Sequence, residues 1–302
     1  MNSPRHTIVG LGELLWDMFP SGQQLGGAPA NFAYISSLLG NEGIVASRVG
    51  GDGLGDEAVQ RLSAVGVNTR FIQRDGGHPT GTVRVDVDGA GQPRFEIGEE
   101  VAWDFLEWTP AWEELATRAD AICFGSLAQR AAMSRATIRK FVASSRRDTV
   151  RVFDVNLRQQ FYSKQVLAES IESAGIVKLN HEELPRIVEL FGLPPGDEIA
   201  SINALARLFS IKLICVTCGD RGSFLLSEGS LHKHPGYRVR VADTVGAGDA
   251  FTAGLVCEYL RGASLAAMNE AANRAGAWVA SQVGAMPTPD ESGIERELAR
   301  VG

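Results

Sequence analysis

The chain has 302 residues, 44% of them hydrophobic and 22% charged, and a formal net charge of −7 at pH 7. This composition is ordinary for a soluble globular protein, and the length is sufficient for one large α/β domain with a sizeable buried core. The acidic balance and the lack of a basic stripe exclude nucleic acid and anionic membranes as partners, so we expect small-molecule ligands.

The beginning of the chain carries no recognisable targeting signal. Residues 1–17 lead directly into a strand-like pattern, without an apolar stretch followed by a small-residue cleavage site. No apolar run elsewhere in the sequence approaches membrane-spanning length. We therefore expect a cytoplasmic protein.

Short apolar segments alternate with helical patterns along most of the chain. Several of these segments are apolar on both faces, which is typical of strands in a parallel sheet covered by helices. The predicted strands are His6–Gly10, Gly43–Val49, Ala121–Phe124, Val150–Val155, Ile176–Leu179 and Lys212–Val216. The predicted helices are Ala30–Leu39, Asp56–Val65, Ser134–Ser145 and Ile202–Phe209. This order predicts a three-layer α/β/α fold with a mostly parallel central sheet and helices on both faces.

Segment 81–95 has a different pattern. Val83, Val85 and Val87 alternate with polar residues, as in a strand with one polar face, and Gly89 and Gly91 supply a turn. We interpret the segment as an antiparallel hairpin, which is either a lid that excludes water from a reaction or an edge hairpin without function. With no repeats and no linker, we expect a single domain, 1–302, with a small β-sheet lid formed by segments at about 12–25 and 81–103.

Cys215 and Cys218 form a C-x-x-C pair, which has two interpretations. It is the spacing of a redox or metal pair, but no second cysteine pair or nearby histidine completes a zinc set. Cysteines in apolar runs are usually small core residues, so we interpret the pair as two buried side chains at the end of a strand. Without a secretory context we expect no disulfide framework.

The most informative segment is DTVGAGD, at residues 243–249, which precedes AFTAGLVCEYL. Apolar and small residues give the following stretch a helical period, so Gly246 and Gly248 lie where a loop becomes a helix. Glycine there allows backbone N–H groups to approach an anion, and the positive end of the helix dipole attracts it. The segment therefore predicts a phosphate-binding turn.

Asp249 is an unusual residue in an anion-binding turn, because its carboxylate repels phosphate. It is either a helix cap or a base that accepts the proton of a hydroxyl attacking a phosphate. The helix N-terminus should keep Asp249 ionised and make it a weak base, which is sufficient if the transition state is loose. Local spacing alone leaves both roles open.

Two other phosphate-binding fingerprints are missing. The sequence contains no G-x-x-x-x-G-K-[ST], which excludes a P-loop enzyme. After the first predicted strand, Gly10-x-Gly12 is followed by Leu15 where a dinucleotide fingerprint needs glycine or alanine, which disfavours an oxidoreductase.

Two segments near opposite ends of the chain resemble one known family. DTVGAGD resembles the C-terminal signature of the ribokinase-like, PfkB-type carbohydrate kinases, and GGAPANFA at residues 26–33 resembles their N-terminal signature. Smaller matches between them are GGDGLG at 50–55, Asp154-x-Asn156-x-Arg158, Lys178-x-Asn180-x-x-Glu183 and Thr217-x-Gly219-x-x-Gly222. The resemblance spans essentially the whole chain and implies an ATP-dependent sugar kinase.

The resemblance implies roles for the matching residues. Asp249 would be the catalytic base, and the amides of Gly246, Ala247 and Gly248 would form an anion hole for the transferring phosphoryl group. The sugar would be held by Asp17, Gly27 and Asn31, since carboxylates and amides suit neighbouring hydroxyls. Taken singly, Asn31 also suits a helix cap and Asp17 a surface carboxylate.

The resemblance also implies the cofactors ATP and Mg²⁺, and in some members K⁺. Asn180 and Glu183 would organise Mg²⁺ and its waters, although Asn180 alone also suits a plain turn after a strand. The implied nucleotide-binding positions are Asn180, Thr217, Gly219, Gly222 and Asn273. The implied K⁺ positions, mostly backbone oxygens, are Asp243, Val245, Val279, Gln282, Gly284 and Thr288. Roles for Asp154, Asn156 and Arg158 stay open, and an arginine here either serves a phosphate site or bridges acidic neighbours.

Within the family, residues 12–40 and the phrase PRFEIGEEVAWD at 93–104 resemble fructokinases. Ribokinases often place a glutamate after the strand that matches Ala121–Phe124, where this chain has GSLAQR, so ribose is disfavoured. Fructose, phosphorylated at its 6-hydroxyl, is the first expectation, with 2-keto-3-deoxygluconate, another small sugar or a nucleoside as alternatives. A non-catalytic binding protein is the alternative from another class. Lid strands of this family often pair between subunits, which implies a homodimer.

Overall fold

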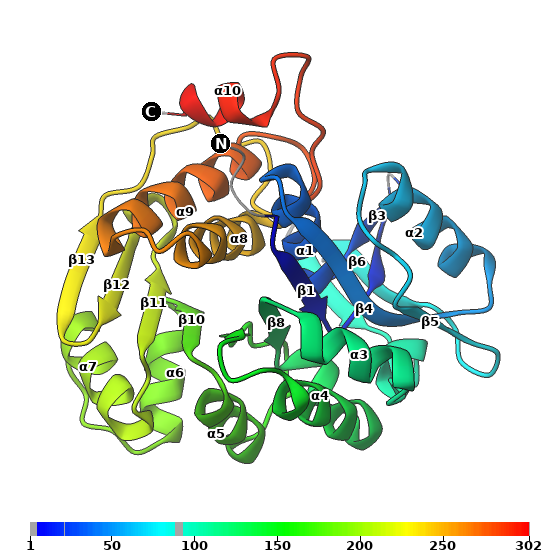
Figure 1. Ribbon diagram of the computed structural model, residues 1–302, viewed down its shortest axis with the longest axis horizontal. Helices are drawn as coiled ribbons and strands as arrows, with labels where there is room; N and C mark the ends of the chain where they lie inside the picture. Colours follow the sequence, from blue (N-terminus) through cyan, green and yellow to red (C-terminus); the bar gives the residue numbers. More distant parts are fainter. Residues whose placement is uncertain (1–4, 21, 88–92, 302) are drawn as a thin grey trace.

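The computed structural model describes residues 5–20, 22–87 and 93–301. A sheet of nine strands runs through the molecule in the order β13-β12-β11-β10-β9-β8-β1-β4-β5 (Figure 1). All neighbouring strands from β5 to β11 are parallel, and β12 and β13 extend that edge in antiparallel fashion. The strands are β1 (Thr7–Leu11), β4 (Glu42–Gly50), β5 (Ile72–Asp75), β8 (Ala121–Gly125), β9 (Val150–Asp154), β10 (Ile176–Asn180), β11 (Leu213–Thr217), β12 (Ser223–Ser227) and β13 (Ser230–His234).

Alternating apolar side chains explain why the sheet is covered on both faces. In β1, Ile8 belongs to one hydrophobic core and Val9 to the other, and Ile176 and Val177 in β10 divide in the same way. A strand that is apolar on both faces requires a helical layer on each side. The two cores therefore lie between the sheet and two layers of helices, which confirms the predicted α/β fold.

The helices form these two layers, and Figure 1 shows α8 and α9 opposite α4 to α7. One layer contains α1 (Ala28–Leu38), α2 (Gly53–Ala64), α8 (Ala247–Leu260) and α9 (Leu265–Ala280), with α10 (Ile294–Ala299) packed on α9. The other contains α3 (Pro110–Arg118), α4 (Ala132–Ser144), α5 (Lys164–Ser173), α6 (Glu183–Leu190) and α7 (Glu198–Phe209). Side-chain oxygens accept backbone N–H groups at several helix starts, at Asp52, Thr109, Ser163, Asp197 and Ser264.

A separate sheet of four strands has the order β3-β2-β6-β7. It is made of β2 (Leu15–Phe19), β3 (Gly22–Gly26), β6 (Gly81–Val87) and β7 (Pro93–Ile97). The predicted hairpin is present, because β6 and β7 pair in antiparallel fashion. The predicted turn at Gly89 and Gly91 lies outside the described residues. The function of this small sheet as a lid stays a prediction.

The four cysteines are free and buried. Burial raises the pKa of the Cys218 thiol to about 11, and it raises the pKa of the Cys215 thiol still further above its ordinary value. Thiols held in their neutral form are poor nucleophiles and poor metal ligands. The core interpretation of the C-x-x-C pair is therefore confirmed. Among the described residues, no helix combines the length and apolar character needed to cross a membrane.

The strand order contains one topological switch point. In the large sheet, β4 and β5 lie on one side of β1, whereas β8 and the later strands of this sheet lie on the other side of β1. Loops leaving β1 and β8 therefore diverge at the carboxyl edge of the sheet. In open α/β sheets ligands bind in the crevice that this divergence creates.

Candidate active site

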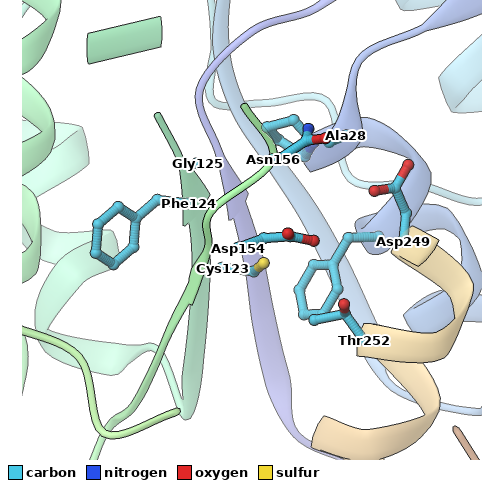
Figure 2. A pocket seen from close by; sticks show the side chains of 10 residues that line it. Ala28, Cys123, Phe124, Gly125, Asp154, Asn156, Asp249 and Thr252 are labelled. Atoms are coloured by element: carbon cyan, nitrogen blue, oxygen red, sulfur yellow. The ribbon is translucent and has the colours of Figure 1, made fainter. Parts of the chain in front are cut away.

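The site lies at that carboxyl edge. A pocket opens between the end of β8, the loop after β9 and the beginnings of α1 and α8. Figure 2 shows Asp154, from β9, and Asp249, from α8, on facing walls of this pocket, with Cys123 and Thr252 beneath them. The sheet thus supplies the floor of the site, and two helix N-termini supply one wall.

Gly246 is the residue that begins α8. It has φ 77°, in the left-handed region, and a Cβ at this position would lie 2.5 Å from the Cβ of Ala285. Glycine is therefore required here both by conformation and by space. The Gly246 carbonyl accepts the first helical bond from Ala250 N at 2.9 Å. The amides of Ala247 and Gly248 follow at the helix start, where backbone N–H groups lack intrahelical acceptors, although Ala247 N also donates to Thr244 O at 3.3 Å.

Asp249 is in the first turn of α8, whereas Gly246 takes the capping position. Its Oδ2 accepts a 2.7 Å hydrogen bond from Nδ2 of Asn31 on α1. Burial, reinforced by the nearby charge of Asp154, raises the pKa of Asp249 to about 6, although Asn31 opposes the shift. The expectation of a weak base with a low pKa is therefore wrong, because desolvation outweighs the helix dipole. A carboxylate with this pKa is a better base and is still mostly ionised at neutral pH.

A buried ion pair lies beside the start of α8. Lys178 Nζ lies 3.0 Å from Asp154 Oδ2, and both side chains are almost completely buried. A Cβ on Gly248 would lie 3.1 Å from the same Nζ, so the ammonium group sits directly beside this glycine. Burial alone would lower the pKa of Lys178, but Asp154, Glu183 and Asp249 together raise it above its ordinary value. The Lys178 ammonium therefore stays charged beside the helix start, while Asp154 balances its charge.

Asn180 and Glu183 bind one another at the beginning of α6. Glu183 Oε2 accepts Asn180 N at 2.8 Å, and Asn180 Oδ1 accepts Glu183 N at 2.8 Å. The second Glu183 oxygen, Oε1, accepts Leu157 N at 2.7 Å from the loop after β9. This reciprocal arrangement resembles a capping box and fixes both side chains. Because both Glu183 oxygens already accept backbone N–H groups, an influence on a metal ion through an intervening water fits better than direct ligation.

Asp17 and Gly27 lie near the first turn of α1. A Cβ on Gly26 would lie 2.6 Å from Asp17 Oδ2, so this carboxyl lies against the chain that leads into the helix. Burial raises the pKa of Asp17 to about 6, while Arg158 acts in the opposite direction. Gly27 has φ 112°, and a Cβ there would lie 2.5 Å from Glu13 O. Close packing against the loop after β1 thus explains this glycine without a ligand.

The predicted nucleotide positions divide into two groups. Thr217 ends β11, and its carbonyl accepts His181 N at 2.9 Å, while Cys218 N donates to Gly222 O at 2.7 Å across the turn that contains Gly219. This turn lies beside the Asn180 turn at the carboxyl edge. Asn273, by contrast, uses its amide inside the fold, donating to Ser223 Oγ at 2.8 Å and Asn269 O at 2.7 Å. It joins α9 to β12, and an adenine contact stays a prediction.

The predicted K⁺ positions lie on the loop before α8, in the last turn of α9 and on the loop after α9. Asp243 accepts hydrogen bonds from Val245 N at 3.0 Å and from Gly284 N at 3.1 Å, and Gln282 N donates to Val279 O at 2.9 Å. Thr288 interacts with the Tyr34 hydroxyl. The Asp243 carboxylate therefore ties the loop before α8 to the loop after α9. In the described part of the chain no group of three or more His, Cys, Asp or Glu side chains is arranged to hold a metal ion.

Known proteins resemble this chain in both sequence and fold. Residues 19–291 match the pfkB family carbohydrate kinase description. The chain belongs to this family of carbohydrate kinases. The kinase is 32% identical to a sugar kinase of Pyrococcus horikoshii over 308 residues, covering 96% of this chain and 94% of that protein. It is 33% identical to a fructokinase of Escherichia coli, covering 82% of each chain.

Solved structures share the fold of the kinase. The crystal structure of the uncharacterised P. horikoshii sugar kinase in complex with ATP superimposes with a TM-score of 0.82 at 30% identity, covering 97% of this chain and 99% of that one. The fructokinase from Vibrio cholerae O395 with fructose, ADP and a calcium ion gives 0.81 at 25% identity and covers both chains completely. The protein is thus an ATP-dependent carbohydrate kinase of ribokinase-like fold, which confirms the family prediction.

Lys178 and Glu13, two charged residues of the kinase site, received no role from the sequence, which also left the role of Arg158 open. Lys178 lies beside Gly248, Arg158 lowers the pKa of both Asp17 and Asp249, and Glu13 is buried near Asp249. Lys178 and Arg158 belong to motifs that the sequence shows, but their partners come from other strands. Glu13 comes shortly after the predicted strand His6–Gly10, and a carboxylate near that edge of a parallel sheet was the available signal.

Proposed function

We propose that this kinase transfers the γ-phosphoryl group of ATP to the 6-hydroxyl of D-fructose, with Asp249 as the base. The observation that carries the proposal is a pocket at the start of α8, lined by Asp249, a carboxyl with a raised pKa in the first turn of a helix that Gly246 caps. The E. coli and V. cholerae relatives named fructokinases support fructose as the acceptor. The ATP complex of the P. horikoshii enzyme supports ATP as the donor.

Several residues of this chain have separate roles in the proposed reaction. Asp249 accepts the proton of the sugar hydroxyl as its oxygen forms a bond to the γ-phosphorus, and the bond from that phosphorus to the ADP oxygen breaks. Asn31 orients the Asp249 carboxylate. The amides of Ala247 and Gly248, with the Lys178 charge beside them, stabilise the negative charge on the transferring group.

Bound metal ions would supply charge neutralisation beside the phosphates. Mg²⁺ would be held through waters near Glu183, whose two oxygens are fixed by Leu157 N and Asn180 N. K⁺ would be held by backbone oxygens of the loops that Asp243 joins. A cytoplasmic location and a homodimer stay predictions of the sequence.

The proposal is tested by a coupled assay of ADP release. The acceptors are fructose, ribose, 2-keto-3-deoxygluconate, inosine and adenosine, each at matched concentrations with MgATP. We expect the highest kcat/KM with fructose and a product phosphorylated at the 6-position by NMR. A higher kcat/KM with a nucleoside or with 2-keto-3-deoxygluconate would reject fructose as the acceptor and retain the kinase.

A further inference from the structure

Glu13 is a buried carboxyl in the loop between β1 and β2. Its exposed fraction is 2%, and its backbone carbonyl lies beneath Gly27 at the start of α1. The preceding residue, Gly12, ties this loop to β4 because Gly12 N donates to Ala46 O at 3.1 Å. Glu13 is therefore held at the carboxyl edge of the sheet, next to the switch point and beside the first turn of α1.

One oxygen of Glu13 has nothing to bind. Oε2 is buried and has no hydrogen-bond partner among the described residues, and the same is true of Asn31 Oδ1, on the residue that holds Asp249. Buried polar atoms are rarely left without partners, and each exception calls for a ligand, an ordered water or a cost in stability. Two such atoms beside one candidate base indicate a ligand with several hydroxyl groups.

The charges around Glu13 place it in the same site as the base. Burial, reinforced by the charges of Asp249 and Asp154 and opposed by Arg158, raises the pKa of Glu13 to about 7. The backbone agrees with this placement, because Glu13 O packs against Gly27, and the Gly27 carbonyl accepts a 3.0 Å hydrogen bond from N of Asn31, the residue that holds Asp249. Asp154 is already paired with Lys178, which leaves Glu13, Asp17 and Asp249 as an acidic group around Arg158.

We propose that Glu13 is a specificity-determining residue of the acceptor site and that its carboxyl hydrogen-bonds a hydroxyl of a neutral sugar. This inference rests on the proposed function. A carboxyl offers an acceptor in either protonation state and a donor when protonated, so it matches the two hydrogen-bonding capacities of a hydroxyl. Three carboxyls at the acceptor end disfavour a sugar acid or a sugar phosphate. The site therefore selects an uncharged polyhydroxylated acceptor.

Binding calorimetry on the full chain tests the role of Glu13 without requiring turnover. Fructose and ATP are titrated separately into wild type, Glu13→Ala and Glu13→Gln. We expect Glu13→Ala to weaken fructose binding by about tenfold or more, and Glu13→Gln to weaken it less, because the amide keeps a donor and an acceptor. ATP affinity should change by less than about twofold in both variants.

Asp120→Asn is the matched control. Asp120 lies before β8 at the opposite edge of the sheet, where it accepts Thr7 N at 2.8 Å and pairs with Arg146. The Asp120→Asn substitution should leave fructose affinity unchanged.

Two outcomes would overturn the inference. One is equal fructose affinity in wild type and in Glu13→Ala whose fold has been checked by circular dichroism. The other is equal weakening of fructose and ATP binding. The proposed function can fail separately. If wild type binds fructose but phosphorylates no sugar, and Glu13→Ala no longer binds fructose, the inference stands and only the proposed function is rejected.

The preference for a neutral acceptor has its own readout. The ratio of dissociation constants for 2-keto-3-deoxygluconate and fructose is measured in wild type and Glu13→Gln. We expect wild type to favour fructose and Glu13→Gln to reduce that preference, because the amide removes a negative charge. A wild type that binds the acid more tightly than fructose would overturn the neutral-acceptor part of the inference.

Discussion

Asp249 combines two properties that oppose each other at most helix starts. The helix N-terminus favours its ionised form, whereas burial and Asp154 disfavour it, and burial prevails. Asn31 fixes the direction of the carboxylate through a 2.7 Å hydrogen bond. A base that must be deprotonated to act, with a pKa of about 6, makes activity sensitive to mild acid.

Substitution of this base should remove turnover and retain nucleotide binding. We expect Asp249→Asn to lower kcat by at least ~10², with ATP affinity changed by less than about twofold. In wild type, kcat/KM should fall as the pH drops below about 6, because the base becomes protonated. The pH profile from 5 to 8 measures this, and its midpoint belongs jointly to the neighbouring carboxyls. A variant that turns over like wild type would rule out Asp249 as the base.

The Lys178–Asp154 pair offers a second prediction at this scale. Removing only the ammonium, in Lys178→Met, leaves Asp154 buried and unpaired, which should cost about 3–5 kcal/mol in the free energy of unfolding. The double variant Lys178→Met/Asp154→Leu should recover much of that stability and remain inactive, since the charge beside Gly248 is gone. Urea unfolding and the ADP assay measure the two effects. A double variant that regained activity would show that the pair has no catalytic effect.

The positions of strands and helices could be predicted from the sequence, whereas the contacts between side chains on different elements could not. The six predicted strands and four predicted helices are confirmed within a few residues at each end, because hydrophobic periodicity is a local signal. The hydrogen bond from Asn31 to Asp249 joins residues 218 positions apart, and no local pattern encodes it. The raised pKa of Asp249 was missed for the same reason, since desolvation depends on the complete fold.

The turn into α8 depends on glycine for two separable reasons. In Gly246→Ala, the alanine would have a strained backbone at φ 77°, and its Cβ would collide with Ala285. In Gly262→Ala, the backbone would be strained at φ 71°, but the added Cβ would have no atom within 4 Å. We expect Gly262→Ala to cost about 1 kcal/mol and to retain activity, and Gly246→Ala to cost about 2–4 kcal/mol and to lower kcat. Thermal unfolding and steady-state kinetics compare them. Equal losses in both variants would mean that the space around Gly246 is unimportant.

The small sheet should respond to the acceptor. If it closes over the site as a lid, amide hydrogen exchange in β2 and β6 should slow when fructose and an unreactive ATP analogue are bound. The β12–β13 pair at the far edge of the large sheet serves as the internal reference. Exchange rates in β2 and β6 that do not depend on ligands would argue against a lid.

For the whole molecule, the site is a source of pH-dependent instability. The pKa values of Glu13, Asp17 and Asp249 are raised to about 7, 6 and 6 from 4.5, 3.8 and 3.8. Between about pH 4 and 7 the native state therefore binds more protons than the unfolded state, so this contribution to stability decreases as the pH rises. Chemical denaturation at pH 5 and 7.5 should show a smaller decrease in Glu13→Gln/Asp249→Asn than in wild type. An equal decrease in both proteins would contradict these shifts.

The hydrogen bond between α1 and α8 has a consequence for biosynthesis. Its two residues are 218 positions apart, and strand β1, which precedes α1, pairs with β8, more than a third of the chain away. A nascent polypeptide that has emerged only as far as β11 contains Glu13, Asp17 and Asn31 but lacks Asp249, the proposed base. Catalytic competence must therefore arise late, after translation has passed residue 249, and partially synthesised chains expose an unfinished crevice to chaperones and proteases.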